Sequence, residues 1–139
     1  SLTEMVRMLS PKMNDGASIM ALTYYGSTRY MQSYNVMGVA KAALETSIKY
    51  LAVDMGDRGI RVNAISAGPM RTLAGAVINK SRQIYNYTID NSPIKKPLSL
   101  EDIGKSSVYL MSDLSKGVTG EILYVDNGYN NVGMSIQDL

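Results

Sequence analysis

Tyr34 and Lys41 are the two side chains whose types and spacing best suit catalysis. Seven residues make about two turns of an α-helix, so on a helix both side chains would project from one face, with about 10 Å of axial rise between their backbones. A free tyrosine hydroxyl has a pKa of about 10, and a nearby ammonium group lowers that pKa by favouring the phenolate. Lys41 would supply the ammonium group and could also hydrogen-bond a sugar diol.

Tyr24 provides a second phenol at the end of the apolar run 17–24, which reads as a strand. In an open parallel sheet, ligands bind at the carboxyl edge, and the helix carrying Tyr34 and Lys41 would begin from that edge. We therefore expect the three side chains to surround one crevice. The ordinary alternative is a tyrosine ring packed in a core and a lysine extended to solvent, and spacing alone does not decide between them.

The missing residue types exclude several classes of site. The chain has no Cys and no His, which rules out thiolate or imidazole metal sites, disulfides and Ser–His–Asp triads, so we expect no metal. A net charge of +2 with scattered Lys and Arg does not suggest a nucleic-acid partner. The sequence also lacks the ~20-residue apolar window of a membrane helix and the pattern of a signal peptide, so we expect a cytoplasmic protein.

The elements that would position these residues follow from apolar spacing and turn residues. With 139 residues, 45% of them apolar, the chain suits one domain. Strands are expected over 17–24, 60–66 and 121–125, and a long helix over about 33–55 joins the first two. Such a βαβ unit implies parallel strands and a right-handed crossover.

Further helices are expected before and after this unit. They are the end of an amphipathic helix at 2–9, two pieces near 72–78 and 81–90, and a helix running to about Met111. Ser99 and Asp102 would open the last of these with a capping box in its Asp variant.

Several segments resemble one known family. Residues 24–45 are similar to the active-site segment of bacterial enoyl-acyl carrier protein reductases of the short-chain dehydrogenase/reductase superfamily. The resemblance continues through 59–74, 113–115, 117–121 and 125–129, which covers nearly the whole chain. Its discriminating feature is Tyr-x6-Lys, because ordinary members of the superfamily, including ketoacyl reductases, use Tyr-x3-Lys and would need a tyrosine in place of Met37.

The resemblance implies a Rossmann-like doubly wound parallel sheet and reduction of the trans-2 double bond of enoyl-acyl carrier protein thioesters by NADH, with NADPH not excluded. Tyr34 would hold the thioester carbonyl and stabilise the enolate, Lys41 would bind the nicotinamide ribose, and Tyr24 would line the acyl site. The backbone of Met70 would meet the nicotinamide carboxamide and Thr72 the pyrophosphate. The other implied residues are Gly68 and Pro69 at the cofactor, and Met37 and Ala74 at the substrate.

The resemblance also implies partners. Segment 69–97 would close over the acyl chain and present Lys80 and Arg82 to the acidic carrier protein, although both could equally be solvated helix charges. Small residues of the long helix, Gly38 among them, fit a homotetramer or packing within one chain. The chain departs from the family pattern at Ser81, where an aromatic residue is frequent, and at Asn127, where a second glycine is common.

The sequence contains no glycine-rich strand–loop–helix fingerprint and no residue that would distinguish NAD from NADP. By the resemblance these parts precede the present segment, so we expect residues 1–139 to be the carboxyl-terminal half of a single reductase domain and to bind dinucleotide poorly alone. Two alternatives stay open: another short-chain reductase acting on a ketone or 3-oxoacyl thioester, and a non-catalytic fragment of the same fold.

Overall fold

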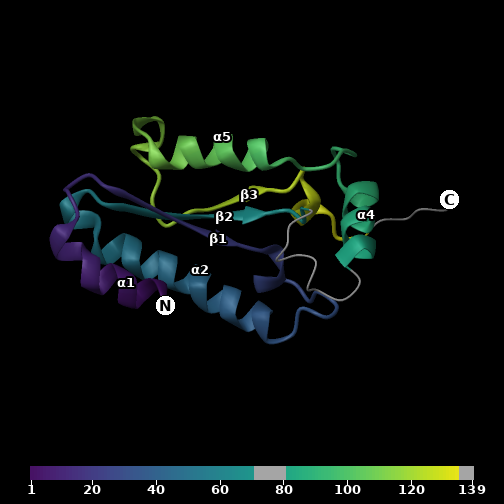
Figure 1. Ribbon diagram of the computed structural model, residues 1–139, viewed down its shortest axis with the longest axis horizontal. Helices are drawn as coiled ribbons and strands as arrows, with labels where there is room; N and C mark the ends of the chain where they lie inside the picture. Colours follow the sequence, from purple (N-terminus) through teal and green to yellow (C-terminus); the bar gives the residue numbers. More distant parts are fainter. Residues whose placement is uncertain (71–80, 135–139) are drawn as a thin grey trace.

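A computed structural model describes residues 1–70 and 81–134. Three strands form one sheet, and helices surround it (Figure 1). The strands are β1 (Ser18–Thr23), β2 (Arg61–Ala67) and β3 (Ile122–Val125). The helices are α1 (Leu2–Leu9), α2 (Val36–Asp54), α4 (Ser81–Asn91) and α5 (Leu100–Met111).

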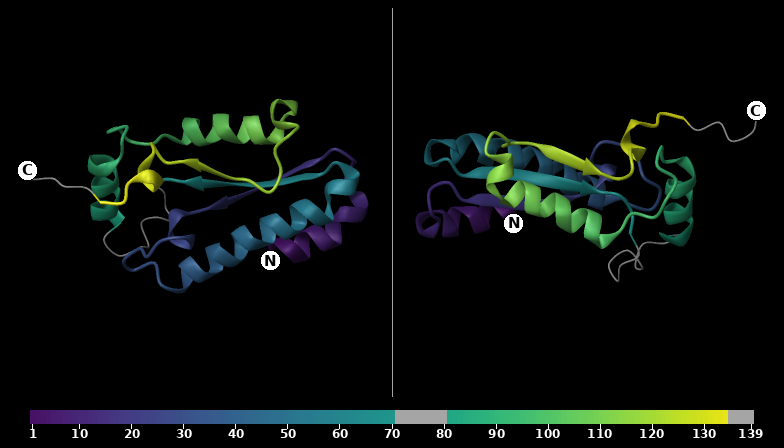
Figure 2. Two further views of the ribbon diagram at one scale, coloured as in Figure 1. Left: turned by 180° about the vertical axis from the view of Figure 1, so that it is seen from behind. Right: turned by 90° about the horizontal axis from the view of Figure 1, so that it is seen from above.

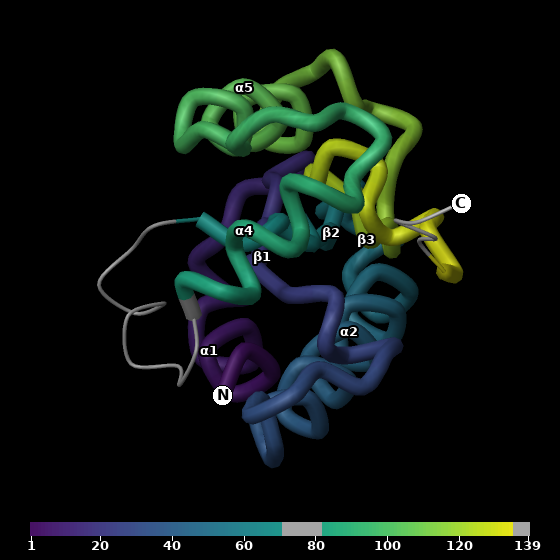
Figure 3. The backbone as a smooth tube through the Cα atoms, turned by 90° about the vertical axis from the view of Figure 1, so that its right-hand side faces the viewer, coloured from purple at the N-terminus to yellow at the C-terminus, as the bar shows by residue number. Residues whose placement is uncertain are grey.

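The sheet is parallel throughout, in the order β1-β2-β3. Its register places Thr23 opposite Ser66 and Ile65 opposite Leu123. Helices α1 and α2 cover one face and α5 covers the other, which confirms the predicted doubly wound α/β architecture (Figures 1 and 2). The β1-α2-β2 crossover is right-handed, as predicted. The connection from β2 through α5 to β3 crosses the sheet in the same direction but over the opposite face, so this second crossover is left-handed (Figure 3).

The core has two halves because the central strand is buried on both faces. Successive side chains of a strand point to opposite sides, so Val62 and Ala64 pack with Ile48 of α2, whereas Ile65 packs with Leu110 of α5. All five are almost completely buried. The strand also buries Arg61, Asn63 and Ser66, so it is not a continuous apolar run, and its position was indicated by the glycine-containing turns on either side.

Arg61 is a charged residue inside this core, and it anchors the end of α5. Its guanidinium donates to the backbone oxygens of Leu110 at 2.9 Å and Ser112 at 3.0 Å, and to the Ser115 hydroxyl at 2.8 Å. The last carbonyls of a helix have no partner within the helix and carry the negative end of its dipole. Arg61 therefore satisfies these carbonyls from the neighbouring strand.

The capping box predicted for α5 is confirmed. The Asp102 amide donates to the Ser99 hydroxyl at 3.1 Å, and the Ser99 amide donates to an Asp102 carboxylate oxygen at 3.0 Å. The Ser99 hydroxyl also donates to the Asp102 carboxylate at 2.6 Å, and this bond, followed by the one from the Ser99 amide, lowers the pKa of Asp102. The three strands and α4 also lie within one or two residues of their predicted positions, whereas the helix predicted at 72–78 lies outside the described residues.

The predicted start of the long helix at Ser33 is wrong. Helix α2 begins at Val36, because Ser33 and Asn35 have positive φ angles of 66° and 49° that a right-handed helix cannot include. Tyr34 therefore lies in a turn before the helix and not on it. Within the described ranges, no helix is long and apolar enough to cross a membrane.

Candidate active site

Two tyrosine rings meet at the carboxyl edge of the sheet. Tyr24 directly follows β1, and Tyr34 comes from the turn that leads into α2. Their ring centroids lie 5.0 Å apart and their planes are inclined by 64°. Such an edge-to-face contact stabilises a pair of aromatic rings beyond simple burial. The predicted proximity of Tyr24 and Tyr34 is therefore present, although it is reached through a turn and not along a helix face.

Two glycines hold the Tyr34 ring in place. A Cβ atom at Gly26 would lie 2.6 Å and 2.8 Å from two carbons of the Tyr34 ring, and one at Gly38 would lie 2.8 Å from the Gly26 carbonyl oxygen. All three distances are too short for a real side chain, so the turn at Tyr25–Ser27 can lie against the start of α2 only because these residues are glycines. The small residue at position 38 thus serves packing within one chain.

Lys41 reaches the same edge from the second turn of α2. Its ammonium nitrogen donates to the backbone oxygen of Leu22, near the end of β1, at 2.9 Å. An ammonium group has three donors, and among residues 1–70 and 81–134 the bond to Leu22 is the one that Lys41 makes. Two donors therefore remain for hydroxyl groups of a ligand.

The expected effect of Lys41 on its neighbour is wrong for this structure. Burial raises the pKa of Tyr34 above its ordinary value, and no lowering by the ammonium group accompanies it. Burial, followed by the neighbouring tyrosines Tyr129, Tyr34 and Tyr25, raises the pKa of Tyr24 to about 12. Both phenols are therefore neutral near pH 7 and act there as hydrogen-bond donors.

A buried carboxylate fixes α2 to β1 beside Lys41. The Thr23 hydroxyl donates to a carboxylate oxygen of Glu45 at 2.6 Å, and both residues are buried. Lys41 and Glu45 lie one helical turn apart, and they bond to two adjacent residues of β1. Two successive turns of α2 are therefore hydrogen-bonded to the end of β1. The sequence analysis missed Glu45, and its position four residues after Lys41 is the one signal that could have indicated it.

Gly68, Pro69 and Met70 follow β2 at this same edge. The Gly68 amide donates to the Val125 carbonyl at 2.9 Å, which extends the pairing of β2 with β3. A Cβ atom at Gly68 would lie 3.0 Å from the backbone of Asp126, so the two strand ends approach closely here. Because Thr23 pairs with Ser66, this turn begins beside Tyr24. Among the residues predicted at the site, Thr72 and Ala74 lie outside the described residues.

Further tyrosines extend the site toward α4. The rings of Tyr25 and Tyr129 meet edge to face with centroids 5.5 Å apart, and burial raises the pKa of Tyr129. A cavity of about 450 Å³ lies between residues 30–33, α4 and Tyr129. Its lining includes Met31, Ile84, Tyr87 and Thr88. Sequence analysis did not assign Tyr129 to the site because only the tertiary fold brings it to Tyr25.

Met37 lies in the first turn of α2 and is about half exposed, away from the lining of the 450 Å³ cavity. In the parts of the chain that the structure describes, no three Asp, Glu, His or Cys residues come together as a metal site would require.

A parallel α/β sheet with candidate ligand-binding side chains at its carboxyl edge is the arrangement of the doubly wound, Rossmann-type folds. The family model described as enoyl-(acyl carrier protein) reductase matches residues 1–130. The chain belongs to this enoyl-acyl carrier protein reductase family.

Individual relatives agree with this assignment. The chain is 56% identical to enoyl-[acyl-carrier-protein] reductase [NADH] 1 of Rhizobium meliloti, over 99% of this chain and 51% of that protein. It superposes on the crystal structure of FabI from Candidatus Liberibacter asiaticus with a TM-score of 0.91 and 56% identity, covering 96% of this chain and 52% of the other. The reductase of Anaplasma phagocytophilum, solved in complex with NAD, gives a TM-score of 0.90 at 50% identity, covering 96% and 51%. The chain thus spans about half the length of the relatives it matches.

Proposed function

We propose that this chain supplies the substrate-and-nicotinamide half of an NADH-dependent reductase that reduces the trans-2 double bond of enoyl-acyl carrier protein thioesters in fatty acid elongation. The observation that carries the proposal is the contact of Tyr24 with Tyr34 at the carboxyl edge of the sheet, with Lys41 anchored to the same edge. The named activity of the Rhizobium meliloti relative supports it.

Tyr34 holds the oxygen on which negative charge develops. NADH, when bound, would supply a hydride to the β-carbon of the enoyl thioester and become NAD⁺, and the enolate left on the substrate would then take a proton at its α-carbon. Because burial raises the pKa of Tyr34, its hydroxyl stays protonated at neutral pH and donates a hydrogen bond to the enolate oxygen. The close fit of the ring against Gly26 and Tyr24 fixes the direction of that donor before the substrate binds.

The cofactor contacts come from α2 and from the turn after β2. Lys41 uses its two remaining donors for the hydroxyls of the nicotinamide ribose, while its bond to Leu22 keeps the ammonium group at the sheet edge. Gly68, Pro69 and the backbone of Met70 lie along the nicotinamide, on the turn that Gly68 fixes to Val125. Thr72, outside the described residues, would reach the pyrophosphate.

The substrate side lies between the tyrosines and α4. Tyr24 and Met37 border the acyl chain, joined by Ala74 and the rest of segment 69–97, part of which lies outside the described residues. Arg82, which is exposed, and Lys80 would face the acidic acyl carrier protein.

A homotetramer in the cytoplasm completes the proposal. Its support is a set of exposed apolar residues along one side of α2, separated by three or eleven residues, which are close to one and three turns of the helix. The set comprises Val36, Val39, Tyr50 and Val53. Such a face on a long helix fits packing against the same helix of a second copy.

The experiment joins this chain, at Ser1, to the amino-terminal half of the Rhizobium meliloti relative, and the product is called the fused protein below. NADH oxidation is followed with a crotonyl thioester and with an acetoacetyl thioester, and then with NADPH in place of NADH. The proposal predicts turnover of the crotonyl thioester with NADH and little reaction with the acetoacetyl thioester. Preference for the acetoacetyl thioester would show a ketone reductase, and NADH binding without turnover would show a non-catalytic fold.

A further inference from the structure

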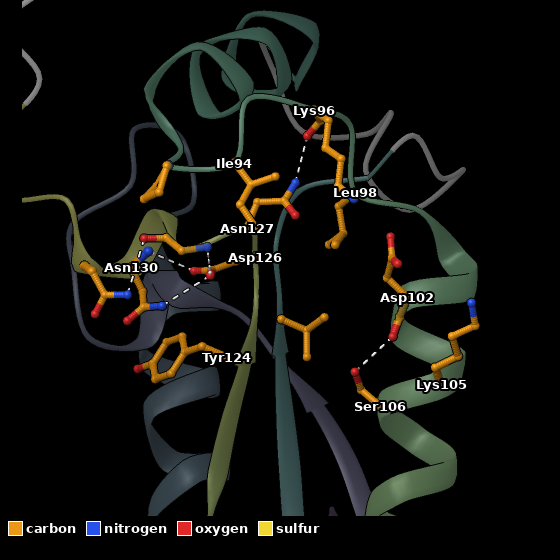
Figure 4. Close-up of a pocket in the computed structure, with 14 residues that line it drawn as sticks. Ile94, Lys96, Leu98, Asp102, Lys105, Ser106, Tyr124, Asp126, Asn127 and Asn130 are labelled. Carbon is orange, nitrogen blue, oxygen red and sulfur yellow. Dashed lines mark hydrogen bonds between the residues drawn. The ribbon is translucent and has the colours of Figure 1, made fainter.

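The segment between α4 and α5 is exposed, yet it is held at a defined place. Residues 93–97 are all exposed, so burial of apolar side chains contributes little to their position. Two hydrogen bonds from one residue hold them: the Asn127 side-chain amide donates to the Lys96 carbonyl at 2.7 Å, and the Ile94 amide donates to the Asn127 carbonyl at 3.2 Å. Figure 4 shows Asn127 reaching from the end of β3 to the backbone of Lys96.

The backbone at position 127 explains why asparagine is suited to this task. Asn127 has a φ of 58° and Gly128 a φ of 83°, so two consecutive residues take the left-handed conformation. Glycine adopts such angles freely, and asparagine is the side chain that tolerates them best together with aspartate. Asparagine alone combines that tolerance with an amide that donates to a carbonyl. A glycine here would keep the turn and lose the bond to Lys96.

The turn that carries Asn127 is itself rigid. The Asp126 carboxylate is buried and accepts hydrogen bonds from the Gly128 amide at 3.0 Å, the Asn130 amide at 2.9 Å and the Asn130 side chain at 3.2 Å. Pro93 lies so close to Gly128 that a Cβ atom there would be 3.0 Å from its ring. Asn127 thus projects from a turn that Asp126 holds in place, and none of the hydrogen bonds of Asp126 involves the Asn127 side chain.

The same junction connects α4 with the turn after β2. Gly68, Pro69, Thr88, Ser92 and Asn127 border one small cavity, so the end of α4, the turn after β2 and the end of β3 meet there. Thr88 also lines the 450 Å³ cavity beside the tyrosines. Segment 93–97 therefore joins α4, which lines that cavity, to the end of β3.

We infer that Asn127 is a positioning residue that fixes segment 93–97 to the end of β3 and thereby sets the place of α4 beside the substrate; the substrate part of this inference rests on the proposed function. Cofactor binding should not depend on the Asn127 side chain, because Lys41 is held by Leu22 and Gly68 is held by Val125. Loss of the bond changes substrate binding and leaves NADH binding unchanged.

The test compares N127G and N127D with N131D in the fused protein. N127D retains the size of the side chain and removes its donor, whereas N131D adds the same charge at a residue whose amide lies 3.4 Å from the Gly128 carbonyl. The net value of one hydrogen bond corresponds to about a fivefold change in an equilibrium. Both variants at position 127 should raise the KM for a trans-2-enoyl thioester about fivefold, with kcat and the KM for NADH unchanged, and N131D should change none of these.

Hydrogen exchange of the Ile94 amide gives a readout that does not need catalysis. It should accelerate about fivefold in N127G and N127D, while exchange of the Gly68 amide stays as in the wild type. Unchanged Ile94 exchange would overturn the positioning role, and faster exchange with an unchanged substrate KM would overturn its link to α4. If the unsubstituted fused protein lacked reductase activity, the proposed function would fail, and Ile94 exchange would still decide whether Asn127 holds the segment.

Discussion

Replacement of Gly26 by alanine tests whether the position of the Tyr34 ring governs the reaction. The new Cβ atom would stand 2.6 Å from the nearest ring carbon, whereas ordinary contacts between carbon atoms are about 3.5–4.0 Å. The ring must therefore move by about 1 Å, and the Gly38 backbone and the Tyr24 ring limit where it can go. A misplacement of about 1 Å can cost about 100-fold in rate, so we expect kcat to fall about 100-fold.

The assay is steady-state oxidation of NADH by the fused protein with a crotonyl thioester. Overpacking also costs about 1–3 kcal/mol of stability, so kinetics are measured well below the unfolding temperature of the variant. Gly104→Ala is the matched control, because a Cβ atom at Gly104, inside α5, would meet nothing within 4 Å. The control should keep wild-type kcat and gain about 0.5–1 kcal/mol of stability. A Gly26→Ala protein that turns over within twofold of the wild type would refute the reasoning.

Three further predictions concern binding and stability of the fused protein. Lys41→Ala should raise the Kd for NADH about 10- to 100-fold through loss of a charged hydrogen bond, measured by titration, with the exposed Lys49→Ala as control; unaltered affinity would contradict the ribose contact. Arg61→Met should lower the free energy of unfolding by about 3 kcal/mol in urea denaturation, because the carbonyls of Leu110 and Ser112 lose a charged donor; a loss below about 1 kcal/mol would count against that role. Burial raises the pKa of Tyr24 to about 12, so the folded state favours the neutral phenol. The contribution of Tyr24 to the free energy of unfolding is complete below pH ~10, the pKa of the unfolded chain, and about 3 kcal/mol of it is lost as the pH rises to ~12. Tyr24→Phe should remove that part of the alkaline loss, and equal pH profiles for the two proteins would exclude it.

Much of the fold could be predicted because its signals are local. Strand β2 lies between Gly59 and Gly68, and the capping box at Ser99 is encoded within four residues. The start of α2 could not be predicted in the same way. The apolar positions of the helical pattern begin at Val36, and neither Ser33 nor Tyr34 marks the preceding residues as non-helical. Asn35 tolerates a positive φ, but one asparagine is a weak signal for the start of a helix.

The sequence predicted which residues form the candidate site better than it predicted how they are arranged. Type and spacing made Tyr24, Tyr34 and Lys41 candidates and the family resemblance selected them, and the structure brings all three to one sheet edge. The details depend on contacts between segments distant in sequence, such as Thr23 with Glu45 and Asn127 with Lys96. Burial, which sets the direction of the tyrosine pKa shifts, is likewise a property of the folded chain and not of the spacing.

In the proposed function, the Tyr34 hydroxyl stabilises the charge that develops on the substrate. The most direct test of this role is the single-turnover rate of the Tyr34→Phe fused protein with saturating NADH and a crotonyl thioester, together with the Kd for NADH. Removal of one donor to a developing oxyanion lowers the rate by about 10²- to 10³-fold, so we predict a fall of that size with unchanged NADH affinity. A Tyr34→Phe protein that reduces the thioester at the wild-type rate would contradict the account.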